Sequence, residues 1–397
     1  MSHPRILFSI EGMTVHQPRS KPLISVFLPT LAGGGAERAM LYLAIGLAER
    51  GWRVDLVLAE AEGEYINHVS PDVRLIDLQA KSPLVVTKTI ALRRYLEKEQ
   101  PAILFSALDI LSSAYWARPA TVPTRIVMCV QTYLSEQFKN HQGQTFGKVR
   151  SRVVRWLYPK SDAIVAASIG TAEDVAQLTG LPVDRIQVIY NPVITQEVFQ
   201  KSEATIDHPW FKSEELPVIL GIGRLVSQKD FPTLITAFAK VRENRPARLM
   251  ILGEGGDRAD LEALIQSFGL ESDVALPGFT ENPYAYLSKA SLFVLSSRFE
   301  GFGNVVAEAL ACGAPVVSTD CPSGPAEILD HGKYGRLIPV ANPTAMTTAI
   351  LEMLDSPVDR TALKRRSLEF ERDRIVDQYV DLIERLLSNA DANSSRS

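Results

Sequence analysis

The chain has 397 residues, more than one ordinary domain core holds, so two domains are expected. Its 46% hydrophobic and 22% charged residues are typical of a folded globular protein and exclude a disordered or fibrous chain. The net charge of −4 gives no overall attraction for nucleic acid or anionic lipid. Nucleic acid is therefore not an expected partner, and any anion site must be local.

The start of the chain and the cysteines indicate a cytoplasmic protein. Residues 1–21 contain a short apolar patch but no cleavage site, and no stretch of the sequence is long and apolar enough to span a bilayer. We interpret 1–21 as an extension of the first domain. Cys129, Cys312 and Cys321 are odd in number and lie in or beside apolar segments, which favours reduced core thiols.

Apolar, β-branched runs alternate with helical segments through the first half of the chain. The runs lie at 23–29, 53–59, 73–78, 102–107, 125–130, 163–168 and 186–191. Because they are continuously apolar rather than alternating, they predict strands buried on both faces of a parallel sheet.

The second half repeats this pattern after a polar, proline-marked stretch without a period of its own. Its runs lie at 218–224, 248–253, 274–278, 292–297, 315–320 and 335–340. The sequence thus predicts an α/β protein with two Rossmann-like, doubly wound parallel-sheet domains facing a cleft. The expected parts are an N-terminal domain (1–195), a linker (196–216), a C-terminal domain (217–365), a terminal helix that packs back on the N-terminal domain (366–388) and a frayed tail (389–397).

Two glutamates lie around one predicted strand-to-helix turn. Glu300 is on the loop, and Glu308 is about one turn into a helix that begins near Asn304. Gly301 and Gly303 let the backbone approach a ligand, and the first N–H groups of a helix attract an anion. Carboxylates accept hydrogen bonds, so the pair suits a ligand rich in hydroxyls. The alternative is that Glu300 caps the helix and Glu308 forms a surface ion pair.

Two cations follow the first strand of the second half. Arg224 and Lys229 are placed where that strand exits toward the predicted cleft. Fixed cations beside a glycine-containing loop hold a diphosphate and stabilise it as it leaves. The alternative is that both are solvated surface groups.

These motifs carry a family resemblance. "GRLVSQKD" (223–230), "FEGFGNVVAEALACGAPVVSTD" (299–320) and "HGKYGRLIPV" (331–340) resemble the C-terminal domain of family 4 retaining glycosyltransferases, which have the GT-B fold and an E-x7-E motif. The resemblance covers most of residues 22 to 388 and is most specific from 218 to 340.

The resemblance implies a role for each matching residue. Arg224 and Lys229 match the pair that holds the donor diphosphate, Glu300 matches the glutamate on the donor sugar, and Glu308 matches the glutamate on the nucleotide ribose. The further donor-binding residues that it implies are Gly223, Gly278, Phe279, Gly301, Phe302, Gly303, Asn304 and Val305. It also implies retention of anomeric configuration with no metal or other cofactor, and the sequence has no DxD carboxylate pair at a strand end.

The N-terminal half has a glycine-rich turn between a predicted strand and a helix. Gly33, Gly34 and Gly35 suit a phosphate or sugar loop and resemble the family's GGxER entrance loop. The competing interpretation is a dinucleotide-binding fingerprint. Arg38 occupies the place of its third glycine, which weighs against that interpretation.

Two further residues are candidates for the acceptor side. Gln131 stands where many relatives carry a histidine, and an amide hydrogen-bonds but does not titrate. Asp109 also follows a predicted strand and is expected either to face the acceptor or to cap the next helix.

The segment 139–160 contains six Lys or Arg and no acid. Its apolar residues recur at helical spacing, with arginines elsewhere around the helix: Val149, Val153, Trp156 and Leu157 against Arg150, Arg152 and Arg155. One interpretation is a helix that lies on an anionic membrane near a lipid-linked acceptor. The other is a helix whose apolar stripe faces the sheet and whose basic face is solvated.

The expected activity is transfer of a hexose or N-acetylhexosamine from a nucleotide diphosphate sugar, with UDP as the expected nucleotide. The expected acceptor is a sugar or a polyprenyl-diphosphate-linked oligosaccharide in surface polysaccharide assembly, at the cytoplasmic face of a membrane. Two alternatives stay open: a sugar-nucleotide-binding protein without transferase activity, favoured by Gln131, and an NAD(P)-dependent oxidoreductase.

Overall fold

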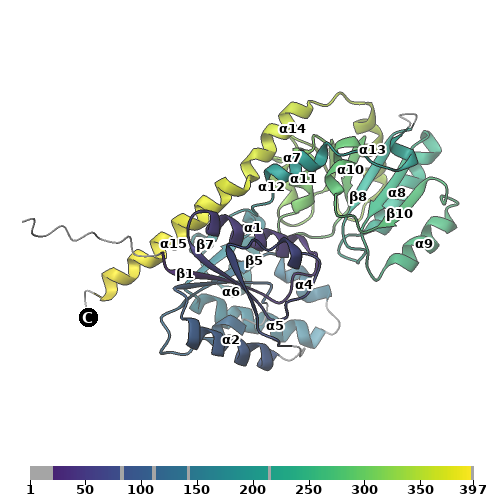
Figure 1. Cartoon of the computed structure of the whole chain (residues 1–397). Coiled ribbons are helices and arrows are strands. Elements are labelled where there is room, and N and C mark those ends of the chain that lie inside the picture. The colour runs from purple at the N-terminus through teal and green to yellow at the C-terminus, as the bar shows by residue number, and fades with distance from the viewer. Residues whose placement is uncertain (1–20, 81–84, 110–112, 141–143, 213–215, 395–397) are drawn as a thin grey trace, which may run out of the picture.

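The computed structural model describes residues 21–80, 85–109, 113–140, 144–212 and 216–394. Two parallel sheets, each flanked by helices, form two domains that meet along their edges (Figure 1). Every strand predicted from the apolar runs is present in the described chain, so the predicted fold class is confirmed.

The N-terminal domain contains a seven-stranded sheet in the order β3-β2-β1-β4-β5-β6-β7. Its strands are β1 (Leu23–Leu28), β2 (Arg53–Leu58), β3 (Val73–Asp77), β4 (Ile103–Ala107), β5 (Arg125–Val130), β6 (Ala163–Ala166) and β7 (Ile186–Val188). Its helices are α1 (Gly35–Glu49), α2 (Val85–Glu99), α3 (Ser113–Ala117), α4 (Leu134–Asn140), α5 (Gln144–Leu157) and α6 (Ile169–Thr179).

The C-terminal domain contains a six-stranded sheet in the order β10-β9-β8-β11-β12-β13. Its strands are β8 (Val218–Ile222), β9 (Arg248–Leu252), β10 (Val274–Gly278), β11 (Leu292–Leu295), β12 (Val316–Thr319) and β13 (Arg336–Ile338). Its helices are α8 (Phe231–Asn244), α9 (Arg258–Ser267), α10 (Pro283–Lys289), α11 (Asn304–Ala311), α12 (Pro325–Ile328), α13 (Pro343–Asp355) and α14 (Arg360–Ser367).

Burial on both faces explains the continuous apolar runs. Every residue of β1 and of β11 is buried, as in a sheet covered on both sides by helices. The helices supply matching faces: Leu234, Phe238 and Val241 of α8 are fully buried.

The segment between the two sheets is structured. It contains α7 (Gln196–Ser202), which contacts α10 and α11 of the C-terminal domain, and a short 3-10 turn, η4 (Pro209–Phe211). The helix α7 has seven residues and one fully buried side chain, Val198, so it is too short to produce a periodic signal in the sequence.

The last helix returns to the first domain. The chain leaves the C-terminal domain through η5 (Leu368–Phe370) and enters α15 (Arg372–Ser394), which runs along the N-terminal domain (Figure 1). Val376 and Tyr379 are buried against the N-terminal core, and Arg372 pairs with Glu49 of α1 at 2.6 Å. The predicted return of the terminal helix is therefore confirmed.

No helix in the described part of the chain is long and apolar enough to cross a membrane. Cys129, Cys312 and Cys321 are all buried, and none is in a disulfide. Burial raises the pKa of each thiol to about 12, so the three side chains act as small apolar groups in the core.

Candidate active site

The strand order places one crevice in each domain, and the two crevices face each other. The order reverses between β1 and β4 in the first sheet and between β8 and β11 in the second. The carboxyl ends of strands at such a reversal border the ligand crevice of a doubly wound sheet. Gly33, Asp109, Arg224 and Glu300 follow β1, β4, β8 and β11 respectively.

A single cavity of about 910 Å³ lies between the domains. Its volume is at the upper end of the range for small-molecule sites, roughly 300 to 1,000 Å³. Nearly all the residues singled out from the sequence line it: Gly33, Gly34, Gly35, Asp109, Gln131, Gly223, Arg224, Lys229, Phe279, Glu300, Gly301, Phe302, Gly303, Asn304, Val305 and Glu308. The exception is Gly278, which is buried at the end of β10 and accepts a hydrogen bond from the Gly253 N–H.

Glu300 and Lys229 form an ion pair on the wall of this cavity. The Lys229 Nζ donates to Glu300 Oε1 at 2.6 Å, and the Ser297 hydroxyl donates to the same oxygen at 2.6 Å. Glu300 is 7% exposed, so its carboxylate is held in one orientation. The alternative role as a helix cap is wrong, because Gly303 precedes α11 and no side chain caps that helix.

Arg224 differs from Lys229 in its surroundings. Its side chain is exposed at the cavity and makes no hydrogen bond or ion pair within the described ranges. The nearby Glu37 carboxyl has its pKa raised by burial, and the charge of Arg224 acts in the opposite direction. Arg224 is therefore a free cation at the mouth of the site, available to an anionic ligand.

The amino end of α11 points at the same space. Its first N–H groups have no carbonyl within the helix to bond, and they carry the positive end of the helix dipole. Gly303 has φ +90°, a conformation that favours glycine. At Gly301 a Cβ atom would overlap the Gln131 carbonyl oxygen of the other domain, so only glycine allows this approach.

Glu308 lies one turn into α11 and is paired across the cleft. Its carboxylate accepts a hydrogen bond from Arg38 of α1, and Arg38 also donates to the Tyr284 hydroxyl of α10 at 3.0 Å. The Glu308 side chain is 3% exposed. The surface ion pair considered as its alternative is therefore wrong, because the pair is buried and joins the two domains.

Asp109 and Gln131, the two residues predicted for the acceptor side, differ in the hydrogen bonds that their side chains make. Asp109 Oδ2 accepts hydrogen bonds from the Ala114 N–H at 2.8 Å and the Ser106 hydroxyl at 3.2 Å, so Asp109 holds the start of α3 while lining the cavity. Gln131 is 9% exposed, and its Oε1 has no protein partner in the parts of the chain described. Gln131 therefore has a side-chain oxygen available to a ligand.

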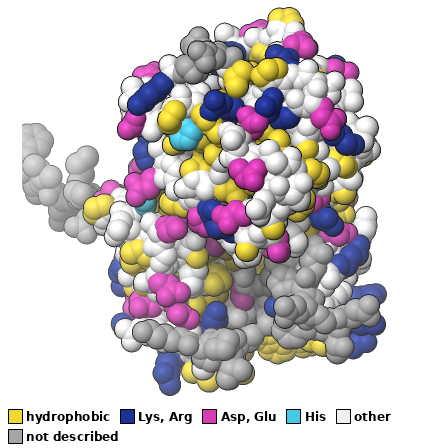
Figure 2. Space-filling model, turned by 90° about the vertical axis from the view of Figure 1, so that its right-hand side faces the viewer, with side chains coloured by type: hydrophobic (Ala, Val, Ile, Leu, Met, Phe, Trp, Pro, Cys, Tyr) yellow, Lys and Arg dark blue, Asp and Glu magenta, His cyan; other side chains and the backbone are white. Residues whose placement is uncertain are grey.

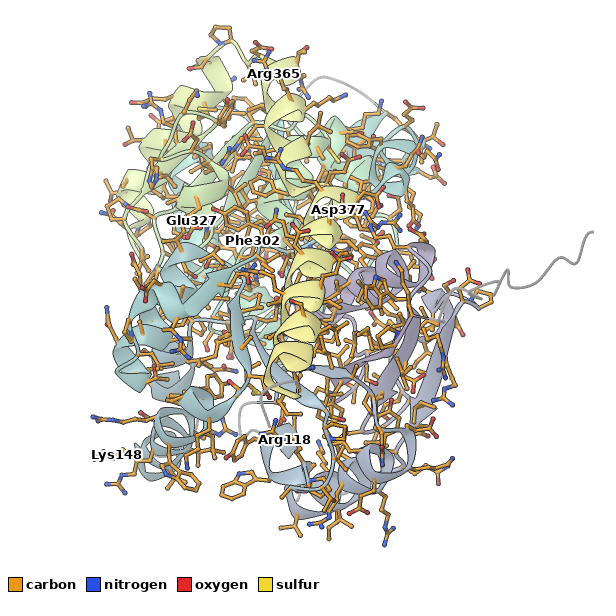
Figure 3. All side chains as sticks on the ribbon, turned by 90° about the vertical axis from the view of Figure 1, so that its left-hand side faces the viewer. Arg118, Lys148, Phe302, Glu327, Arg365 and Asp377 are labelled. Carbon is orange, nitrogen blue, oxygen red and sulfur yellow. The ribbon has the colours of Figure 1, made fainter. Side chains whose placement is uncertain are left out.

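Several hydrogen bonds hold the domains together around the cleft. The Asn304 Nδ2 donates to the Gly35 carbonyl at 2.7 Å, and the Ser168 hydroxyl donates to the Gly301 carbonyl at 2.6 Å. On the other side of this contact, Glu327 accepts hydrogen bonds from the Ile169 and Gly170 N–H groups at the start of α6. Figure 3 shows Glu327 and Phe302 where the two domains meet.

Sequence reasoning missed the partners in these contacts. In the sequence, Arg38 stands out only as the residue in place of the third glycine of a dinucleotide motif, and Tyr284 and Ser297 carry no signal. The GGxER resemblance contains Arg38 and was the one feature that could have identified it.

In the GT-B class of glycosyltransferases, two parallel-sheet domains place their ligand crevices face to face. This chain has that arrangement, with cations and the amino end of a helix on one side of the cleft. A model described as "Glycosyltransferase Family 4" matches residues 33–197, and one described as "Glycosyl transferases group 1" matches residues 202–370. The chain belongs to the family 4 glycosyltransferases. This decides between a glycosyltransferase and an oxidoreductase in favour of the former.

Two curated relatives align over most of their length. The N-acetylgalactosamine-N,N'-diacetylbacillosaminyl-diphospho-undecaprenol 4-alpha-N-acetylgalactosaminyltransferase of Campylobacter jejuni is 29% identical over 352 residues, which are 87% of this chain and 93% of the relative. The lipopolysaccharide core biosynthesis glycosyltransferase LpsE of Rhizobium meliloti is 28% identical over 372 residues, 88% of this chain and 96% of the relative.

Solved structures share the fold at low identity. Sucrose-phosphate synthase of Thermosynechococcus elongatus superposes with a TM-score of 0.80 at 20% identity, covering 93% of this chain and 100% of that one. HepE of Anabaena, in complex with UDP and glucose, superposes with a TM-score of 0.73 at 19% identity, covering 91% of this chain and 99% of that one.

Proposed function

We propose that this enzyme is a retaining, metal-independent hexosyltransferase that uses a UDP-sugar. The observation that carries the proposal is the arrangement on the C-terminal wall of the cleft: the free Arg224, the fixed Lys229–Glu300 pair and the amino end of α11. Together they offer cations and amides to a diphosphate and a carboxylate to sugar hydroxyls. HepE, the structural neighbour named above, binds UDP.

In the proposed reaction an acceptor hydroxyl bonds to the anomeric carbon as that carbon loses its bond to the diphosphate. The hydroxyl proton passes to the leaving phosphate oxygen. Arg224, Lys229 and the α11 amides stabilise the charge that develops on the diphosphate, so no divalent ion is required. Glu300 orients the donor sugar, and Gln131 Oε1 is placed to accept a hydrogen bond from the sugar or the acceptor.

The proposed acceptor is a sugar or a polyprenyl-diphosphate-linked oligosaccharide in surface polysaccharide or lipopolysaccharide assembly. The Campylobacter relative is named for such a lipid-linked acceptor and the Rhizobium relative for lipopolysaccharide core synthesis. The N-terminal side of the cavity reaches Gln137 of α4 and Tyr158 directly after α5. An acceptor bound there extends toward α5, the basic helix.

The test is turnover in EDTA with a panel of UDP-hexoses and UDP-N-acetylhexosamines and lipid-linked oligosaccharide acceptors. We expect UDP release with one donor class, and a first-formed product with the anomeric configuration of the donor by proton NMR. UDP binding without turnover on any acceptor would instead support a binding protein. An inverted product would contradict the retaining mechanism.

We also propose peripheral contact with an anionic membrane through α5. In this helix Val154 and Leu157 pack inward, while Val149 and Trp156 are 46% and 54% exposed, so the expected single apolar stripe is divided between core and surface. The exposed apolar residues lie among exposed cations: Lys148, Arg152, Arg155 and Lys160. Such a mixture of apolar and basic side chains is typical of a membrane-surface helix.

A neighbouring helix extends this surface. Trp116 of α3 is 48% exposed and its ring lies 5.5 Å from that of Trp156, and the Lys160 Nζ is 3.3 Å above the Trp156 ring. Tryptophan rings are enriched at the headgroup level of a bilayer, and lysine side chains extend their charged ends to the same level. Figure 3 shows Arg118, directly after α3, and Lys148 at the end of the N-terminal domain away from the C-terminal domain. The face in Figure 2 instead shows both charge signs interspersed over the C-terminal domain.

Changing Arg152 and Arg155 together to Gln is expected to weaken binding to phosphatidylglycerol vesicles about 30-fold, at about 1 kcal/mol for each basic residue. Co-sedimentation measures this, with phosphatidylcholine vesicles as reference. The matched control changes Lys364 and Arg365, two exposed cations on α14, to Gln. Equal losses in both variants, or no vesicle binding by the wild type, would refute the proposed surface.

A further inference from the structure

Arg38, Glu308 and Tyr284 form a buried cluster across the cleft. Arg38 comes from α1 of the N-terminal domain, and its partners come from α11 and α10 of the C-terminal domain. The Arg38 side chain is 14% exposed and that of Glu308 is 3% exposed. The pair forms only when the two domains are together, because its members belong to opposite walls of the cleft.

The cluster fixes the orientation of the Glu308 carboxylate. Arg38 donates to Glu308 Oε1 from one terminal nitrogen and to the Tyr284 oxygen from the other. Burial raises the pKa of Glu308, and the charge of Arg38 and a hydrogen bond from Tyr284 act in the opposite direction. An ionised carboxylate is the form that accepts hydrogen bonds from two hydroxyls, so these neighbours favour the binding form.

The arginine also has a free donor. Its Nε is buried and has no hydrogen-bond partner within the described chain, although Arg38 lines the cavity. A buried donor without a partner costs about 1 to 3 kcal/mol. A ligand oxygen that reaches this N–H would recover that cost, which links ligand binding to the closed arrangement of the domains.

We propose that Arg38 is a positioning residue that couples closure of the acceptor domain to recognition of the donor ribose. Arg38 reaches across the cleft and orients the Glu308 carboxylate toward the ribose hydroxyls. The ribose therefore makes its full set of hydrogen bonds only when the domains are closed. The inference rests on the proposed use of a UDP-sugar and on the ribose role that the family resemblance implies for Glu308. It adds a residue of the opposite domain to that site.

The test compares UDP with 2′,3′-dideoxy-UDP by calorimetry, because the second ligand lacks the hydroxyls that Glu308 is expected to hold. Wild-type enzyme is expected to prefer UDP about 10- to 150-fold, the value of a hydrogen bond to a charged group. In Arg38→Met the preference should largely disappear, because the Glu308 carboxylate is no longer held in the orientation that accepts hydrogen bonds from the ribose hydroxyls. Affinity for the dideoxy ligand should change little, and a merely structural defect would weaken both ligands alike.

Two further variants are measured beside Arg38→Met, in case that variant folds poorly. The double variant Arg38→Met with Glu308→Gln removes both charges and should fold, since removing both partners of a buried pair is far milder than removing one. It should also lose the preference, because the Glu308 carboxylate itself is gone. Arg38→Lys keeps the positive charge but loses the planar guanidinium group with its two terminal nitrogens. It should restore part of the preference for UDP over the dideoxy ligand.

The outcomes separate this inference from the proposed function. Wild-type enzyme that does not bind UDP would overturn the proposed function and the inference with it. Wild-type enzyme that prefers UDP, with an unchanged preference in Arg38→Met, would overturn the role of Arg38 alone. An unchanged preference in the double variant would overturn the ribose role of Glu308 as well.

Discussion

Replacing Arg224 by Ala is expected to lower turnover about 10- to 150-fold, because a charge-assisted contact is worth about 1.5 to 3 kcal/mol and strengthens as charge develops on the leaving diphosphate. Arg224 has no protein partner in the described chain, so its removal leaves no group unsatisfied. Stability should therefore stay unchanged while the rate falls.

Lys229→Ala is expected to lower turnover at least as much as Arg224→Ala, for an additional reason. Lys229 holds Glu300, whose carboxylate would keep only the Ser297 hydroxyl after the change. The Glu300 carboxylate would then be mobile, and its negative charge would no longer be balanced by the Lys229 ammonium group. This variant should lose some stability as well as rate.

Initial rates of UDP release from the donor measure both effects. Lys240→Ala, which removes an exposed lysine on α8 away from the cavity, is the matched control and should keep the wild-type rate. Near-wild-type rates for Arg224→Ala and Lys229→Ala would contradict the diphosphate role of this pair.

Phe302→Ala is expected to lower the free energy of unfolding by about 3 to 5 kcal/mol, the usual cost of truncating a fully buried aromatic side chain. Phe302 is 2% exposed. Its ring centroid lies 5.4 Å from that of Tyr190, after β7, and 5.3 Å from that of Phe370, before α15. The ring thus joins both domains and the start of the terminal helix, and Phe302 also lines the cavity.

Chemical denaturation measures this change, with Phe279→Ala as control. Phe279 also lines the cavity but is 48% exposed, so its truncation should alter stability by only about 0.5 kcal/mol or less. If Phe302→Ala were as stable as Phe279→Ala, the aromatic contact would not be holding the domains together.

The sequence predicted the strands well because burial on both faces leaves a strong compositional trace. Continuous runs such as those at 23–29 and 292–297 have no other good explanation in a chain of alternating elements. The same runs located the site, since Arg224 and Glu300 stand directly after strands that border the reversal of strand order. The strand order then places Arg224 and Glu300 at the same cavity.

What the sequence could not show depends on long-range packing. Arg38 and Glu308 are 270 residues apart, and nothing local in either helix indicates that the two meet. Phe302 lies between two glycines of a donor motif, so it was grouped with them, although its ring is part of a core shared by three segments. The contact of Trp116 with Trp156 likewise requires the placement of α3 beside α5.

The central claim is that the cleft binds a uridine diphosphate without a metal, and thermal unfolding with UDP, GDP and NAD in turn, each with and without EDTA, tests it most directly. Ligand at 100 times its Kd adds about 2.7 kcal/mol to stability, enough to raise the melting temperature by several degrees. We predict a shift with UDP that EDTA leaves unchanged and that disappears in the Arg224→Ala, Lys229→Ala double variant. A shift that requires a divalent ion, or a shift with NAD and none with UDP, would contradict the account.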